Sequence, residues 1–151
     1  MAIGPTAGSI IYIGTTESSP SPDDYIAIGE VTDFGSFGRV YQEIKVDTVG
    51  TRGTRKFKGT YDDGSVTLKV VRDASDVGQA AAITARDSDS DYNFKILLND
   101  DETGGFTTPT TLTFKAKVMS YTLEMGGPNS VVMATVNLAI KSGTIVETAA
   151  A

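Results

Sequence analysis

The acidic residues are the first side chains in this sequence that could do chemistry. Asp87-Ser88-Asp89-Ser90-Asp91 has the alternating carboxylates that open a calcium-binding loop. An EF-hand also needs glycine at the sixth position and a carboxylate at the twelfth. Tyr92 and Leu98 occupy those positions, so the EF-hand interpretation fails. The simpler interpretation is a solvated turn, and we predict no metal site and no cofactor here.

Two further acidic clusters, Asp62-Asp63 and Asp100-Asp101-Glu102, raise the question of acid catalysis. A glycosidase needs two carboxylates that face each other across a cleft, and acids in turns are usually solvated instead. The chain has no histidine and no cysteine, which removes the usual general base and the commonest metal ligand. We therefore predict that the protein is not an enzyme, with an acid-based hydrolase as a disfavoured alternative.

A glycine-rich segment, Thr48 to Thr60, concentrates positive charge without a clear periodicity. It is no phosphate loop, because it lacks the G-x-x-x-x-G-K-[ST] spacing. The chain is acidic, with a formal net charge of −6, so we expect an acidic protein partner rather than nucleic acid. A solubilising loop and the tip of an extended hairpin both remain open. Its candidate contact residues are Arg52, Arg55, Lys56, Phe57 and Lys58.

The length and composition indicate one globular domain covering residues 1–151. A chain of 151 residues fits a single domain, and 40 % hydrophobic with 21 % charged residues is typical of a globular rather than a disordered protein. No stretch approaches the ~20 apolar residues of a membrane span, so no membrane insertion is expected.

Alternating apolar residues predict that most of the chain is β-strand. Arg39 to Asp47 is predicted as a half-buried strand with Val40, Ile44 and Val46 facing the core. In Thr111 to Met125 the apolar positions change phase, which indicates a β-bulge.

One helix is predicted, over Asp73 to Arg86, with Asp73 or Ser75 as its N-cap. The tail from 142 to 151 is small in side-chain size and is expected to be flexible. The predicted fold is mainly β: a β-sandwich or partly open barrel of seven or eight strands with one flanking α-helix.

The order of these features resembles the major tail tube proteins of long-tailed, siphovirus-like bacteriophages, over nearly the whole chain. The resemblance rests on the combination of segments rather than on one motif. The segments are Ser9 to Gly14, Ile28 to Phe34, Val49 to Phe57, Asp62 to Leu68, the helix Asp73 to Ala85 and the final pair of long strands.

This resemblance implies a structural, non-enzymatic subunit of the virion tail. In that family six copies form a ring, and rings stack into a hollow tube through which double-stranded DNA and the tape measure protein pass. The partners it implies are other copies of the chain, the tape measure protein, the tail tip and the tail terminator, with assembly in the bacterial host cytoplasm. Inner tubes of contractile tails and of secretion systems are related alternatives.

The resemblance also suggests roles for particular residues. The basic segment matches the family's ring-stacking loop in position and character, and acidic residues Asp87, Asp89 and Asp91 of the next ring are its candidate partners. Glu43 and Asp47 are candidate lumen-facing residues, because an acidic lumen repels phosphates and lets DNA slide.

A monomeric β-sandwich that binds carbohydrate or a protein ligand is the alternative from another class. Such a module would need exposed aromatic side chains along a groove, yet the chain has no tryptophan and only 8 % aromatic residues. It would also predict a compact monomer with a short, ordered segment at Thr48 to Thr60.

Overall fold

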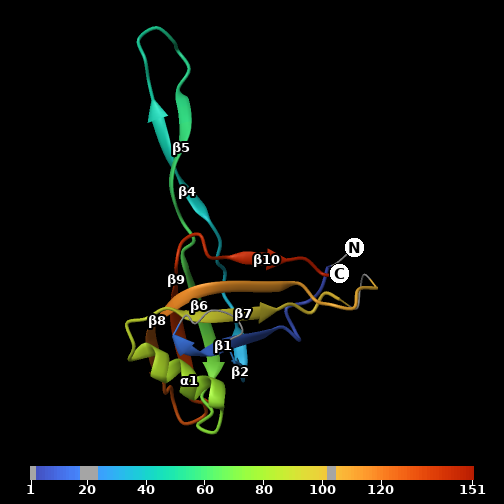
Figure 1. Ribbon diagram of the computed structural model, residues 1–151. Helices are drawn as coiled ribbons and strands as arrows, with labels where there is room; N and C mark the ends of the chain where they lie inside the picture. The colour runs from blue at the N-terminus through green and yellow to red at the C-terminus, as the bar shows by residue number, and fades with distance from the viewer. Residues whose placement is uncertain (1–2, 18–23, 102–104) are drawn as a thin grey trace.

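In the computed structural model, which describes residues 3–17, 24–101 and 105–151, a β-rich body carries one long projecting hairpin (Figure 1). Ten strands and one helix lie in this part of the chain, which confirms the mainly β prediction but exceeds the seven or eight strands expected. Glu102, one of the candidate acids, lies outside the described residues. The elements are β1 (Ile10–Glu17), β2 (Tyr25–Ile28), β3 (Val31–Asp33), β4 (Val40–Val46), β5 (Arg55–Asp62), β6 (Ser65–Val71), α1 (Val77–Arg86), β7 (Tyr92–Leu97), β8 (Thr111–Glu124), β9 (Met133–Ile140) and β10 (Val146–Thr148).

The body is built from one curled antiparallel sheet rather than from two separate sheets. Its strand order is β2-β1-β7-β8-β9-β6-β3, and β10 adds to β8. A register shift between Val118 and Ser120 bends β8, as the change of phase in its apolar positions predicted. The two ends of the order, β2 and β3, do not pair with each other, so the sheet forms a partly open barrel.

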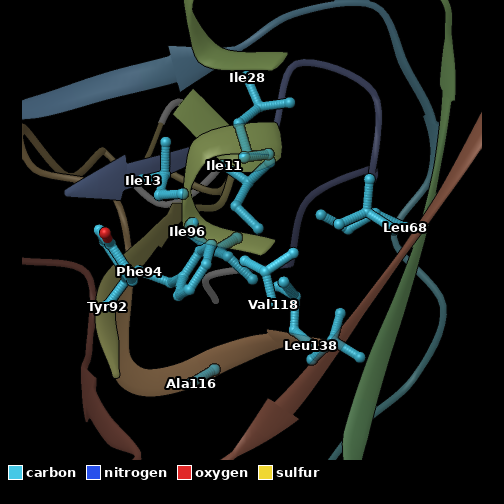
Figure 2. Close-up of a cluster of buried hydrophobic side chains, with 14 of the residues drawn as sticks. Ile11, Ile13, Ile28, Leu68, Tyr92, Phe94, Ile96, Ala116, Val118 and Leu138 are labelled. Carbon is cyan, nitrogen blue, oxygen red and sulfur yellow. The ribbon is translucent and has the colours of Figure 1, made fainter. Parts of the chain in front are cut away.

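The inner face of this sheet lines a single core. Every second residue of β6, β7 and β9 is buried, which is the period-two pattern of a sheet with one covered face. Phe94 and Phe114 stack at the centre with their ring centroids 5.6 Å apart. Figure 2 shows Ile11, Phe94 and Leu138, from three different strands, converging on this core.

The helix α1 begins at Val77, four residues later than predicted, because Asp76 rather than Asp73 or Ser75 is its N-cap. The Asp76 carboxylate accepts a hydrogen bond from the Gln79 amide at 3.0 Å. Asp73 instead accepts from the backbone and hydroxyl of Ser75, which holds the residues before the helix in a turn. Among the described residues, no helix has the length and apolar character needed to cross a membrane.

The helix docks tightly on the strand β2 and closes one side of the barrel. Gly78 allows this approach, because a Cβ atom there would lie 2.1 Å from the Ala27 carbonyl oxygen. The next residue, Gln79, is fully buried, and its side-chain amide forms hydrogen bonds through both its nitrogen and its oxygen. Its Nε2 donates to Val71 O at 2.9 Å, and its Oε1 accepts from the Tyr121 hydroxyl at 3.2 Å.

The tail from 142 to 151, expected to be flexible, instead contains β10. This strand pairs with the first three residues of β8, and Thr144 fixes the preceding turn by accepting a hydrogen bond from the Lys115 amide at 3.2 Å. At the end of the chain, the Ala151 carbonyl accepts from the amides of Thr107 and Thr108, both at 2.9 Å. The tail is therefore tied to the body by β10 and by these backbone hydrogen bonds.

Candidate assembly surfaces

The most prominent surface is the hairpin formed by β4 and β5, which leaves the body as a separate two-stranded ribbon (Figure 1). Within the described residues these strands form their sheet only with each other, with Ile44 opposite Phe57 and Val46 opposite Arg55. The predicted loop from Thr48 to Thr60 is therefore wrong in its second half, and the hairpin interpretation is confirmed. A β-bulge between the two strands and three glycines hid the period-two pattern from view.

One face of this hairpin is apolar and uncovered. The prediction of a half-buried β4 is wrong for the isolated chain, because every residue of the strand is exposed. Val40 is 64 % exposed and Phe57 is 55 % exposed, and Ile44 and Val46 are exposed on the same face. We call these four residues the apolar hairpin face. An exposed apolar surface of this kind marks an interaction site.

The opposite face of the hairpin is polar and holds most of its charge. Lys56 pairs with Glu43 across the strands at 3.3 Å, and the Lys58 ammonium lies 4.9 Å from the Tyr41 ring centroid. Lys45, directly opposite Lys56, adds a further positive charge. The hairpin is thus two-sided, with basic residues behind the apolar ones.

The structure divides the predicted stacking residues between these two faces. Phe57 and Arg55 share a face with the apolar residues, whereas Lys56 and Lys58 lie on the polar face. Arg52 lies in the connection at the hairpin tip. Glu43 and Asp47, the candidate lumen residues, also belong to the hairpin, and their lumen-facing role stays a prediction.

At the root of the hairpin, a buried carboxylate joins three segments of the chain. Asp63 is fully buried, which corrects the view of the Asp62-Asp63 pair as a solvated turn. Its Oδ1 accepts from Arg39 Nε at 3.0 Å, and its Oδ2 accepts from the Gly143 amide at 2.7 Å. The hydrogen bond from Gly143, together with the Arg39 guanidinium, holds the pKa of Asp63 below its ordinary value, although burial acts to raise it.

This lowered pKa gives a prediction for acid stability. Because the folded carboxylate binds its proton less readily than the unfolded one, its stabilising effect is full above its ordinary pKa near 3.8. The effect is lost as the pH falls through the lowered value. In urea unfolding at a series of pH values, wild-type stability should fall more steeply below about pH 4 than that of Asp63→Asn.

An exposed acid provides the control for this titration. Asp89→Asn removes an exposed carboxylate that makes no ion pair within the described part of the chain, so it controls for the loss of one acidic charge. Parallel curves for wild type and Asp63→Asn would show that Asp63 does not contribute to the acid slope.

The acidic turn between α1 and β7, which holds the predicted stacking partners, is already partly neutralised. Asp87 pairs with Arg86 at 3.1 Å, and Asp91 pairs with Lys117 at 2.7 Å. Asp89 is exposed and makes no ion pair in the described part of the chain, so it is the acid of this turn best placed to meet a basic partner. No group of three acidic side chains in the described ranges is placed to share a metal ion.

A second apolar surface, which the sequence did not single out, lies where β8 and β9 meet beyond the core. It consists of Leu123, Met125 and Val131, which are between 52 % and 65 % exposed. Met119, also exposed, lies at the bulge of β8 apart from them. We call it the β8–β9 patch. Figure 1 shows this end of β8 beside α1, on the side of the body away from the hairpin. The phase change in β8 was the available signal, because it keeps Leu123 on the same face as the buried Ala134 while the strand extends beyond the core.

The fold of this chain is that of the subunits that build tubes in phage tails and contractile injection systems. A subunit in the baseplate structure of the anti-feeding prophage superposes with a TM-score of 0.68 at 16 % identity, covering 99 % of this chain and 98 % of the other. A subunit in the SPP1 tail tube structure gives 0.66 at 14 % identity, with 96 % and 80 % covered. The sheath–tube complex of the PVC extracellular contractile injection system gives 0.66 at 14 % identity, with 97 % and 92 % covered. No protein-family model and no curated protein match the sequence itself.

Proposed function

We propose that this chain is a structural subunit that assembles with copies of itself into a hollow tube. The observation that carries the proposal is the apolar hairpin face, which stands away from the body on a tube-subunit fold with nothing in the described chain to cover it. Removing such a face from water favours association, and a second copy of the chain is the partner that is always present.

The positions of the two apolar surfaces favour contacts that repeat head to tail. The hairpin rises from one end of the body, and the end of β8 that carries the β8–β9 patch lies at the other (Figure 1). When two different surfaces of identical subunits bind each other, every added subunit leaves one surface free at each end. Such contacts therefore extend into rings or filaments. We propose that the apolar hairpin face of one copy packs on the β8–β9 patch of the next.

Charge also supports contacts between copies. The basic side chains gather on the hairpin, and the acidic turn that contains Asp89 lies between α1 and β7, where Asp91 reaches Lys117 and Lys141. Where the hairpin of one copy meets Asp89 of a neighbour, the opposite charges would steer the encounter and help to fix its register. Ion pairs on a surface add little affinity, so the apolar contact supplies most of the association free energy.

The finer features of the assembly extend this proposal. The subunits would form rings, six to a ring, and the stacked rings would enclose a lumen for DNA and the tape measure protein. The tail tip and the tail terminator would lie at the two ends of the tube. The tube would be part of the virion tail and would assemble in the host cytoplasm. The same subunit geometry would serve the inner tube of a contractile system, which is the second type of assembly among the solved structures with this fold.

The assembly state of the purified protein tests the proposal directly. Light scattering across a range of concentrations and negative-stain electron microscopy should reveal stacked rings or hollow tubes above a threshold concentration. A species that stays monomeric at high concentration, and in the presence of tail-tip components, would sink the proposal.

The basic residues of the hairpin give a second prediction. Replacing Arg52, Arg55, Lys56 and Lys58 with glutamine should slow polymerisation and make its rate less sensitive to salt. Charges steer association over about one Debye length, ~8 Å at physiological ionic strength, and salt screens them. The measurement is the initial rate of scattering increase at several salt concentrations.

A variant of equal net charge controls for the overall loss of cations. It carries glutamine at four lysines of the body, namely Lys69, Lys95, Lys115 and Lys141. If this variant loses as much rate as the hairpin variant, net charge rather than the hairpin governs the encounter.

A further inference from the structure

We infer that Asp63 is a positioning residue that sets the angle of the hairpin in the free subunit, before any partner binds. The inference rests on the proposed function only for its consequence in assembly. Its physical basis is the cluster at the hairpin root. There the buried carboxylate of Asp63, which follows β5, binds Arg39, which precedes β4, and Gly143 of the body.

The first part of the argument is that the hairpin has few other restraints. In the described chain, β4 and β5 form a sheet apart from the main one. Both strands join the body close together, at Arg39 and Asp63, and Gly38 and Gly64 adjoin these two residues. Gly64 has a φ of 81°, a left-handed conformation, and so marks a sharp bend. A ribbon attached at such a narrow root would swing unless something holds it.

The second part is that Asp63 connects the segments that would have to move. Arg39 precedes β4, Asp63 follows β5, and Gly143 lies in the turn between β9 and β10. The carboxylate accepts from the first and the third of these at 3.0 and 2.7 Å. A swing of the hairpin would break at least one of the two bonds and leave a buried charge without a partner, which is strongly unfavourable.

The third part is that the far side of this clamp is rigid. The turn that carries Gly143 is fixed to β8, because the Lys141 amide donates to the Lys115 carbonyl at 2.8 Å. Thr144 adds a bond from its hydroxyl to Lys141 O at 2.6 Å. Gly143 itself has a φ of 83°, and a Cβ atom added there by substitution would lie 3.1 Å from the Tyr61 hydroxyl oxygen. The hairpin is therefore held against a fixed point of the sheet.

Aromatic stacking completes the root from the side of the hairpin. The Arg39 guanidinium lies 4.2 Å from the Tyr61 ring centroid, and Tyr61 packs against Tyr41 at 5.5 Å. Arg39 thus contacts Asp63 with its Nε and the hairpin with its flat face. Fixing the hairpin in advance removes an ordering cost from assembly, because the bound orientation is already present.

Asp63→Asn tests the clamp in the unassembled subunit. An amide at this position cannot accept strongly from both donors, so one bond is lost while the side-chain volume is kept. Because the chain has no cysteine, spin labels can be placed cleanly at Lys45→Cys on β4 and at Ala80→Cys on the exposed side of α1. Pulsed electron resonance then measures the distance between hairpin and body below the assembly threshold.

We expect a narrow distance distribution in the otherwise wild-type subunit and a broad one with Asp63→Asn. The matched control is Asp100→Asn, which removes another buried carboxylate, one that bonds Thr110 in the body. It should lower stability and leave the distribution narrow. A distribution that stays equally narrow with Asp63→Asn would overturn the inference.

Assembly provides the second readout. The threshold concentration for polymerisation should rise about tenfold with Asp63→Asn, equivalent to about 1.4 kcal/mol, and should stay near wild type with Asp100→Asn. A broadened hairpin with an unchanged threshold would overturn the role of the clamp in assembly. If the wild type forms no tubes at all, the proposed function fails, and the distance measurement still decides whether Asp63 holds the hairpin.

Discussion

A subunit that carries both Ile44→Asp and Phe57→Asp should fold normally and fail to form tubes. The two side chains face each other across the hairpin and are 47 % and 55 % exposed. Full burial of such a side chain is worth about 1.5–3 kcal/mol, so covering the exposed halves of both contributes about 1.5–3 kcal/mol to each contact. Since every 1.4 kcal/mol is a factor of ten, loss of this apolar contact should raise the threshold concentration about 10- to 100-fold. Light scattering at increasing concentration measures this threshold.

The fold of this variant is a necessary part of the test. Exposed substitutions change stability by only about 0.5 kcal/mol, so its thermal unfolding should match wild type within a few degrees. Val77→Asp is the control, because Val77 is also an exposed apolar residue, at 62 %, but lies at the start of α1, where an acid is favourable. Normal tubes from Ile44→Asp with Phe57→Asp would show that the hairpin face is not an assembly contact.

Much of the body could be predicted from the sequence, because its pattern and its packing arise within one chain. The alternation in β6, β7 and β9 places the buried residues correctly, since one face of each strand meets the core. The helix was predicted correctly from the recurring small apolar residues, but its predicted start was four residues too early. Several acids precede it, and only the geometry shows that Asp76 caps the helix while Asp73 binds Ser75.

The same pattern misled where burial depends on a second molecule. Val40, Ile44 and Val46 alternate as in any strand with a covered face, yet in the isolated chain they are exposed. Periodicity reports that a face is apolar, and it cannot say whether the cover comes from the same chain or from another. The disagreement between a buried pattern and an exposed strand is itself the signal of an interface.

The clamp at Asp63 could not be predicted for a different reason. Asp62-Asp63-Gly64 is a common turn sequence, and acids in turns are usually solvated. Gly143, the donor to its Oδ2, is 80 residues away in the chain. No local rule connects two such positions, so only the fold reveals that a turn residue has become a buried anchor. Its neighbour Asp62 behaves as the pattern suggests and bonds the Gly64 amide at 2.9 Å.

Gly78→Ala should destabilise the protein although alanine is the better helix former. In an exposed helix this change would add about 1 kcal/mol of stability. Here the new Cβ atom would lie 2.1 Å from Ala27 O and 2.6 Å from the Ile28 Cα, both backbone atoms that cannot rotate away. Forcing an extra carbon into a packed contact costs about 1–3 kcal/mol or more, so the clash outweighs the gain in propensity. Differential scanning calorimetry should show a Tm lower by roughly 2–8 °C.

A second substitution in the same helix separates the clash from the propensity. Thr84 is exposed, and its hydroxyl bonds only the Ala80 carbonyl one turn earlier, so Thr84→Ala gains propensity without a collision. This variant should unfold at or slightly above the wild-type temperature. If Gly78→Ala also unfolds at or above it, the helix must be free to shift on β2. The close approach would then be a consequence of the glycine and not a requirement of the barrel, and the tight docking that closes one side of the core would be adjustable.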